Sequence, residues 1–210
     1  MPTTAIIACG ALAREITELI RLNNWQHMKM HCLPANCHNA PERITPAVEA
    51  KIHSLRDAGY TRVFVAYGDC GTGGRLDELL EREQVERLPG PHCYSFFAGA
   101  SAFDALHEEA LGSFYLTDFL VRHFERLILR EMGIEKHPEL AAMYFGNYTR
   151  LVYLAQTDNP ELQSLARTAA ERLGLDYHYQ LTGYGEMASS LRQVACHNPN
   201  PNPEPIEWHA

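Results

Sequence analysis

Short apolar runs alternate with amphipathic stretches through the first half of the chain. Residues 4–9 form a continuous apolar run, and residues 11–22 then repeat apolar side chains at helical spacing. Residues 62–67 (RVFVAY) are β-branched and aromatic ahead of a glycine cluster, which is typical of a buried strand. This pattern predicts alternating strands and helices. The expected strands are 4–9, 27–33, 62–67 and 91–96, and the expected helices are 11–22, 44–55 and 76–85.

A more helical stretch follows before the alternation returns. Residues 114–132 are predicted as one long amphipathic helix, and residues 137–144 as a shorter helix after a glycine. Strands that alternate with helices at this rhythm pair in parallel through right-handed crossovers. The second alternating region consists of expected strands 151–157 and 177–181 and expected helices 160–173 and 186–194.

The pattern predicts an α/β fold with a mostly parallel, doubly wound sheet of Rossmann-like type, flanking helices and a helical insert. We expect a single domain over residues 1–196, because no linker composition separates the two halves. The alternative is two pseudo-repeated halves, 1–112 and 145–196, around a helical segment at 113–144. Residues 197–210 alternate proline with polar residues, which predicts an extended tail.

Composition narrows the classes of function. The net charge is −8 and no basic stripe occurs, so nucleic acid is not expected as a partner. No apolar window reaches the roughly 20 residues that cross a bilayer, and no export signal is apparent. A cytoplasmic protein with reduced thiols is therefore expected, and its six cysteines become candidates for ligation or catalysis.

Three cysteines are predicted to meet at one edge of the sheet. Cys9 closes the first expected strand, Cys70 follows the third, and Cys93 falls on the fourth. Ligands of open parallel sheets bind at the carboxyl ends of the strands. Thiolates suit zinc and iron–sulfur clusters, and three protein ligands with an open fourth position are typical of a catalytic metal. His38 or His92 is a candidate nitrogen ligand.

Plain core packing is the alternative for these cysteines. Free cysteine is among the most buried residue types, and Cys32 and Cys37 fall near the same edge. The spacings are long, at 61 residues from Cys9 to Cys70 and 23 more to Cys93, and no CxxC pair occurs. Spacing alone therefore does not establish a metal motif.

The glycine-rich segment 68–75 (GDCGTGGR) is a candidate anion site. Its backbone amides, with the start of the following helix, are suited to an anionic substrate group. The segment matches neither common nucleotide motif, so it specifies no nucleotide, and a strand-to-helix turn is the alternative. Gln156 ends a later expected strand at the same edge and is a candidate substrate contact. The expected anion-binding residues are Gly71, Thr72, Gly73, Gly74 and Arg75.

Several segments together resemble a bacterial and archaeal family, domain of unknown function 1638. They span residues 8–191 and include CGALAREI, YGDCGTGG, GPHCYSFFAG, TDFLVRHF and YFGNYTRLVYLAQT. The resemblance implies that Cys9, Cys70 and Cys93 are the family's cysteines, whereas Cys32, Cys37 and Cys196 are not. It also places four further residues in the family's motifs: His38, Asn39, His92 and Asp118.

These observations lead to three functional hypotheses. The first is a small-molecule metalloenzyme with zinc or a [4Fe-4S] cluster on three cysteines, in methyl (one-carbon) or sulfur transfer, with Asp118, His92 or His38 moving protons. The second is a metal-free enzyme with Cys70 as nucleophile. The third is a non-catalytic corrinoid- or metal-binding accessory protein. The resemblance implies a corrinoid-dependent methyltransferase as partner, and a homo-oligomer is left open.

Overall fold

The described structure, a computed structural model, covers residues 3–109 and 111–196. Its strands form two separate all-parallel sheets flanked by helices, ordered β2-β1-β3-β4 and β5-β6-β7. The α/β class and the parallel pairing are therefore confirmed, but the strands that we expected in one sheet lie in two. The tail expected at 197–210 lies outside the described residues. Within the described part, no helix is long and apolar enough to span a membrane.

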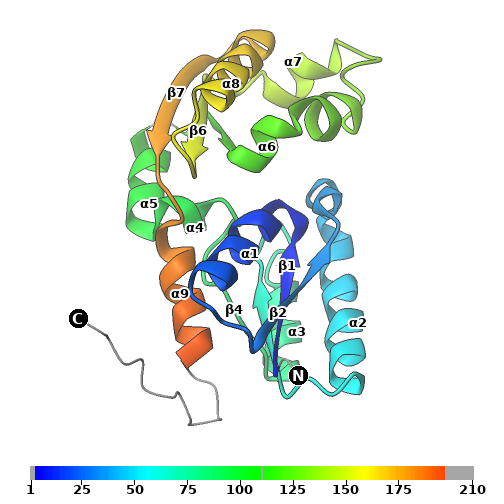
Figure 1. Cartoon of the computed structure of the whole chain (residues 1–210). Coiled ribbons are helices and arrows are strands. Elements are labelled where there is room, and N and C mark those ends of the chain that lie inside the picture. Colours follow the sequence, from blue (N-terminus) through cyan, green and yellow to red (C-terminus); the bar gives the residue numbers. More distant parts are fainter. Residues whose placement is uncertain (1–2, 110, 197–210) are drawn as a thin grey trace, which may run out of the picture.

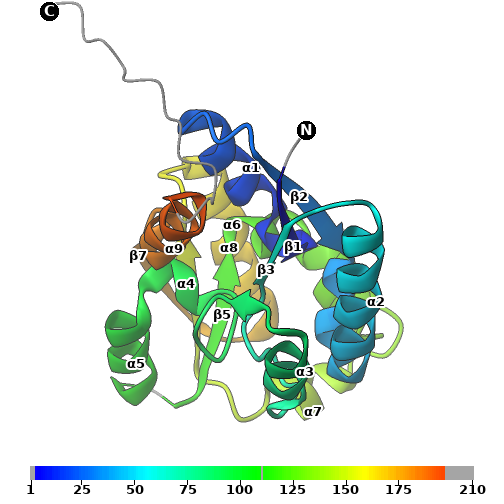
Figure 2. The ribbon, with the colours of Figure 1, turned by 90° about the horizontal axis from the view of Figure 1, so that it is seen from below.

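The first sheet is built around a fully buried central strand. All six residues of β1 (Thr4–Cys9) are buried, because helices cover both faces of the sheet. Seen from below, α1 and α9 lie on one side of this sheet and α2 and α3 on the other (Figure 2). The other strands of this sheet are β2 (Met28–Leu33), β3 (Arg62–Ala66) and β4 (Glu86–Arg87). Its helices are α1 (Ala13–Leu22), α2 (Ile44–Asp57), α3 (Arg75–Glu83) and α9 (Gly185–Cys196).

The second sheet is also covered on both faces. Side chains of β6 alternate between a core with α6 and α8 and a smaller core with α5. A π-helical segment, Glu125–Arg130, contributes to the larger core. The strands are β5 (Ser113–Thr117), β6 (Arg150–Ala155) and β7 (Asp176–Leu181). The helices are α5 (Ala100–Glu109), α6 (Asp118–Arg122), α7 (Leu140–Phe145) and α8 (Pro160–Leu173).

Each sheet and the helices that cover it form one lobe, and the chain crosses between the two lobes twice. The short helix α4 (Ser95–Ala98) and α5 lead out of the first lobe, and α9 returns to it after β7 (Figure 1). Met187 and Leu191 of α9 are fully buried in the core of the first lobe. The first lobe is therefore built from two segments that are distant in sequence.

Two predicted elements are wrong. Residues 91–96 form a turn that enters α4 rather than a strand, and the fourth strand is only the two residues of β4. Residues 114–132 are not one helix, because β5 occupies 113–117 and α6 begins only at Asp118, where the Thr117 hydroxyl accepts a hydrogen bond from the Leu120 amide. A short apolar run such as FYL fits a buried strand as well as a helix.

Candidate metal centre

A cavity of about 560 Å³ lies between the two lobes. The carboxyl ends of both sheets point toward this region, with β6 and β7 directed down toward the first lobe (Figure 1). Its wall takes Cys9 from the end of β1, Tyr67 and Cys70 from the segment after β3, and Thr117 from the end of β5. The cavity therefore occupies the place where parallel sheets bind ligands.

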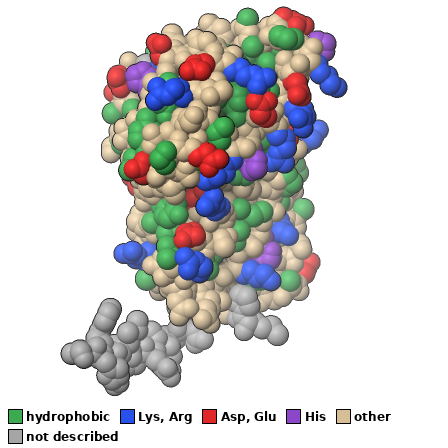
Figure 3. Space-filling model, turned by 45° about the horizontal axis from the view of Figure 1, so that its top comes forward, with side chains coloured by type: hydrophobic (Ala, Val, Ile, Leu, Met, Phe, Trp, Pro, Cys, Tyr) green, Lys and Arg blue, Asp and Glu red, His purple; other side chains and the backbone are tan. Residues whose placement is uncertain are grey.

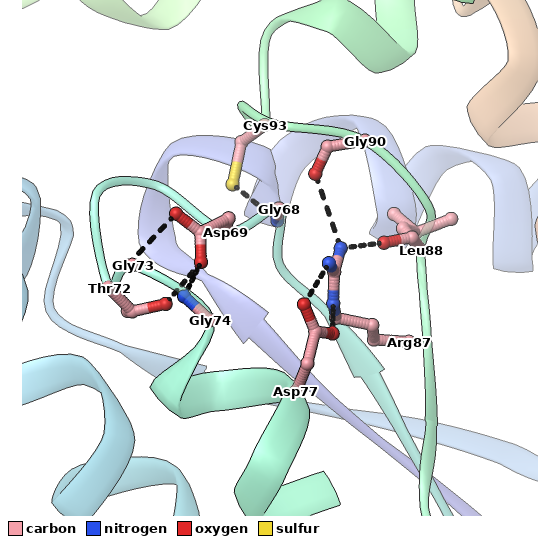
Figure 4. Close-up of polar contacts among 10 residues, drawn as sticks. All are labelled: Gly68, Asp69, Thr72, Gly73, Gly74, Asp77, Arg87, Leu88, Gly90 and Cys93. Carbon is pink, nitrogen blue, oxygen red and sulfur yellow. Dashed lines mark hydrogen bonds and ion pairs between the residues drawn. The ribbon is translucent and has the colours of Figure 1, made fainter. Parts of the chain in front are cut away.

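Cys9, Cys70 and Cys93 come together in the wall of this cavity, and we call them the thiol cluster. All three are buried, with 4 to 9% of their surface exposed. The sulfurs of Cys70 and Cys93 are 3.2 Å apart, and the Gly68 amide donates a hydrogen bond to the Cys93 sulfur at 3.4 Å (Figure 4). Cys93 reaches the cluster from the turn before α4, not from a strand as we expected.

Two loops hold Cys70 and Cys93 against each other. The amide of Cys70 donates to the Pro91 carbonyl at 2.8 Å, and that of Asp69 to the Gly90 carbonyl at 3.2 Å. Cys70 has φ +48°, an uncommon conformation for a residue with a side chain. A Cβ at Gly68 would lie 2.8 Å from a backbone atom of His92, so only glycine allows this approach.

The thiols differ in protonation because they share hydrogen bonds. Cys93 donates to Cys70 and Cys9, which raises the pKa of Cys93 well above its usual value and keeps it protonated. The hydrogen bond from Cys93, followed by one from His38, lowers the pKa of Cys70 to about 5. The pKa of Cys9 is lowered by the same Cys93 donor. The Cys70 thiolate in turn raises the pKa of His38.

The donor set fits a soft metal ion or cluster in kind. Sulfur ligands at the zinc distance of about 2.3 Å lie roughly 3.8 Å from each other in a tetrahedral site. In the structure, the Cys70 and Cys93 sulfurs are 3.2 Å apart, but the three sulfurs of the thiol cluster do not all lie within 4.8 Å of one another. Among the described residues, one group of three His, Cys, Asp or Glu side chains has all its possible ligand atoms within 4.8 Å of one another. It consists of Glu49, His53 and Glu83. Ligation by the thiol cluster would therefore require small side-chain movements.

That acidic triple has its own partners on the protein surface. Glu83 accepts from Arg56 at 2.5 Å and is 3.3 Å from His53, and Glu49 accepts from Arg82 at 2.5 Å. Arginine partners already neutralise these carboxylates, so a cation would have to compete with them. The triple is a surface ion-pair network.

Three of the further candidate residues line the cavity. His38 and Asn39 line it from the 3-10 helix Ala35–Asn39, and His92 lines it from the turn before α4. The Asn39 amide donates to the Leu127 carbonyl of the π-helical segment at 3.4 Å, which links the two lobes. His92 stacks on Tyr94 with ring centroids 4.9 Å apart.

Asp118 and Gln156 are buried but do not line the cavity. The Asp118 carboxylate accepts hydrogen bonds from the Tyr153 hydroxyl at 2.7 Å, the Thr157 hydroxyl at 2.6 Å and the Gln156 amide at 3.0 Å. The Gln156 side chain accepts from the Asp118 amide at 2.8 Å. Both residues therefore join the ends of β5 and β6, and their expected catalytic and substrate-binding roles stay predictions.

The expected anion-binding loop is filled by a carboxylate of the chain itself. Asp69 accepts hydrogen bonds from the Thr72 hydroxyl at 2.5 Å and from the amides of Gly73 at 3.2 Å and Gly74 at 2.9 Å (Figure 4). Burial alone would raise the Asp69 pKa, but these bonds lower it. Arg75 donates to the Thr72 carbonyl at 2.9 Å. Gly71 to Arg75 do not line the cavity, and their expected part in binding an anionic substrate group stays a prediction.

Sequence reasoning missed the aromatic part of the wall. The rings of Tyr94 and Tyr115 stack with centroids 5.5 Å apart and join the turn before α4 to β5. Tyr67 lies against the thiol cluster, where its hydroxyl helps to lower the Cys9 pKa. Tyr67 and Tyr94 each lie close in sequence to a cysteine of the cluster, and this proximity could have indicated that they belong to the same site. Cys32 and Cys196 are exposed, and Cys37 is half-buried but outside the cluster.

A family profile described as "Protein of unknown function (DUF1638)" matches residues 32–191, more than half of the chain. The chain belongs to the DUF1638 family. The match confirms the family that the motifs resembled, and it includes Cys70 and Cys93, whereas Cys9 precedes the matched region. No curated protein and no solved structure matches the chain. The function of this DUF1638 protein must therefore be argued from its own site.

Proposed function

We propose that the protein is a small-molecule metalloenzyme whose metal centre is held by Cys9, Cys70 and Cys93. The observation that supports this is the meeting of three buried sulfurs, one from the end of β1 and two from separate loops, in the wall of a cavity between two lobes. Core packing alone does not require sulfur at three positions that converge on a cavity. Three sulfur ligands would leave a fourth position directed toward substrate.

The residues around the thiol cluster have distinct roles in this proposal. When bound, zinc or a [4Fe-4S] cluster supplies a Lewis acid for a substrate sulfur, oxygen or nitrogen, as methyl or sulfur transfer would use. His38 contacts Cys70 and lines the cavity, so it is placed to hold or move a proton beside the substrate. His92 lines the cavity from the turn before α4, where it stacks on Tyr94.

The proposal also extends to the setting of the reaction. A centre of reduced thiols fits the cytoplasm, where thiols stay reduced. A corrinoid-dependent methyltransferase remains the proposed partner, since methyl transfer needs a methyl donor or acceptor and such a protein would supply one. A homo-oligomer stays a prediction to be tested by the mass of the protein in solution.

Elemental analysis with absorbance spectroscopy on anaerobically purified protein tests the centre. We expect about one zinc, or iron with visible absorbance, per chain. Changing Cys9, Cys70 or Cys93 to Ala should remove it, whereas the matched Cys32→Ala and Cys196→Ala variants should keep it. Metal-free protein that is fully active, or metal that survives all three cluster substitutions, would contradict the proposal.

A metal-free thiol enzyme is the second candidate, and the electrostatics of Cys70 favour it. Its pKa of about 5 and its hydrogen bond from His38 are features of an activated nucleophile. In that case activity should be insensitive to chelators, one equivalent of alkylating agent at Cys70 should abolish it, and Cys9→Ala should retain much of it. The metalloenzyme predicts loss of activity in Cys9→Ala and Cys70→Ala alike.

A further inference from the structure

The wall of the inter-lobe cavity is rich in aromatic rings. Of the ten tyrosines and eight phenylalanines in the chain, eight line this cavity. They include the parallel stack of Tyr94 on Tyr115, together with Phe119 and Tyr148 from the second lobe. Aromatic faces carry negative electrostatic potential and attract cations, most strongly where water is excluded.

The same wall has no strongly basic side chain. None of the 18 lysines and arginines of the chain, all of which the structure describes, lines the cavity. Those on the outer face shown in Figure 3 are intermixed with acidic side chains. Arg150 lies behind the wall, where it donates to the Ser113 hydroxyl at 2.7 Å and to the Leu106 carbonyl at 2.6 Å. A carboxylate or phosphate group would therefore enter without a cationic partner.

The remaining polar groups of the wall favour positive charge. Asp104 of α5 is the one carboxylate among the described lining residues, and it is exposed to solvent. The two histidines are engaged: His38 with the Cys70 sulfur, and His92 in its stack with Tyr94. The filled loop at Asp69 removes the one anion site that the sequence offered.

We infer that the ligand of this cavity is a small organic cation of the alkylated ammonium class and not an organic anion. The inference rests on the proposed function, because it names the substrate class of the same site. The cation's alkyl groups would contact the rings of Tyr115 and Tyr148, since Tyr94 already stacks on both His92 and Tyr115, and Asp104 would balance its charge. Alkyl groups on nitrogen also suit rings better than a bare ammonium, because they weaken its hydration.

Three molecules of equal shape and different charge test this inference by isothermal titration calorimetry on the full chain. They are (2-hydroxyethyl)trimethylammonium, neutral 3,3-dimethylbutan-1-ol and anionic 3,3-dimethylbutanoate. We expect the cation to bind about tenfold more tightly than the neutral molecule, and the anion not to bind. Equal affinity for cation and neutral molecule, tighter binding of the anion, or binding of none of the three up to 100 mM would overturn the inference.

Surface-accessible variants tie the binding to the cavity. Asp104→Asn and Tyr148→Leu should each weaken binding of the cation severalfold, with unchanged circular dichroism. The matched control is Tyr144→Leu, because Tyr144 and Tyr148 are 41% and 38% exposed but only Tyr148 lines the cavity. Equal effects of both tyrosine variants would refute the assignment to this cavity.

Metal content measured on the same preparations separates the two proposals. Cation preference in protein without metal would refute the metal centre and leave the ligand class standing. A loaded centre in protein that selects the anion would refute the ligand class alone.

Discussion

Within the thiol cluster, three identical side chains have different chemistry. Cys93 is enclosed and shares its proton with its neighbours, so Cys70 carries the negative charge and His38 stabilises it. The stabilisation that the Cys70 thiolate gives the fold grows as pH rises from about 5 toward the ordinary thiol value of 9, and it is lost as pH falls through 5. Charge and reactivity are therefore concentrated on one of the three sulfurs.

Alkylation of metal-free protein should show this difference. We expect the rate at Cys70 to rise with pH around a midpoint near 5, since the thiolate is the reactive form. Cys32 is exposed, but partial desolvation of its sulfur and the nearby Cys9 raise its pKa, so it should react only at alkaline pH. Peptide mass spectrometry after timed iodoacetamide treatment measures both rates, and a Cys70 midpoint near 9 would show that the cluster does not share protons as described.

Asp118 should prove structural when it is changed to Asn. The substitution removes the charge that three donors satisfy and turns an NH₂ group toward one of them, so the free energy of unfolding should fall by about 3 kcal/mol. Denaturant titration measures the change. The matched variant Thr157→Ala removes one donor and should cost about 1 kcal/mol. Unchanged stability with lost activity would instead indicate a catalytic role.

The sequence predicted which thiols meet, but not what Asp118 does. Cys9 and Cys70 could be placed because they end or follow a strand, whereas Cys93 was assigned to a strand that is a turn; the family motifs separate all three from Cys32 and Cys37. The partners of Asp118 lie 35 to 39 residues further along the chain, on a strand whose pairing with β5 no local pattern reports. Contacts between residues this far apart in sequence can be recognised only once the pairing of β5 and β6 is known.

At the scale of the elements, most strands and helices follow from local periodicity. The bounds of β1 and α8 were predicted to the residue, because each combines a regular apolar pattern with a clear end signal. The failures are β4 and β5: β4 is only two charged residues long, and the short apolar run of β5 fits a helix as well as a strand. Register and neighbours decide such segments, and both are properties of the completed sheet.

Gly185, at the start of α9, has no room for a side chain. It starts α9 with φ +46°, and a Cβ there would lie 2.1 Å from the Phe97 carbonyl oxygen of α4. Gly185→Ala should therefore lower the free energy of unfolding by about 3 kcal/mol or more. The control is Gly174→Ala, with φ +69° and open space around the Cβ, which should cost about 1 kcal/mol. Similar losses in urea titrations of both variants would mean that the contact with α4 is loose.

At the scale of the whole molecule, sequence reasoning favoured one sheet and kept two halves only as the alternative, whereas the structure has two sheets. Each lobe repeats the same local alternation of strand and helix, so nothing in the pattern states which strands share a sheet. The sequence also does not predict that α9 packs on the first lobe, because its apolar face would fit either sheet. These arrangements depend on contacts that are distant in sequence: paired strand residues lie 22 to 58 positions apart, and α9 packs on α4 across the whole second lobe.

Leu191 should report how far α9 stabilises the first lobe. Its side chain is fully buried in that core, so Leu191→Ala should reduce the free energy of unfolding by about 3 kcal/mol. Labelling of Cys9 in urea should begin at correspondingly lower concentration. Leu165→Ala, on a side chain 47% exposed on α8, is the matched control and should change stability by less than about 1 kcal/mol. Equal shifts in both variants would indicate that α9 is not part of the first core.

The position of α9 also has a consequence for synthesis on the ribosome. The first sheet leaves the ribosome early, yet one of its faces waits for a helix that is translated after the entire second lobe. At roughly 5 to 20 residues per second, that interval lasts on the order of 5 to 20 s. During it, an apolar face is open to chaperones and to other nascent chains, while the three thiols have already been made. In the proposed metalloenzyme, loading of the metal centre and release of chaperones would then compete for the same incompletely folded lobe.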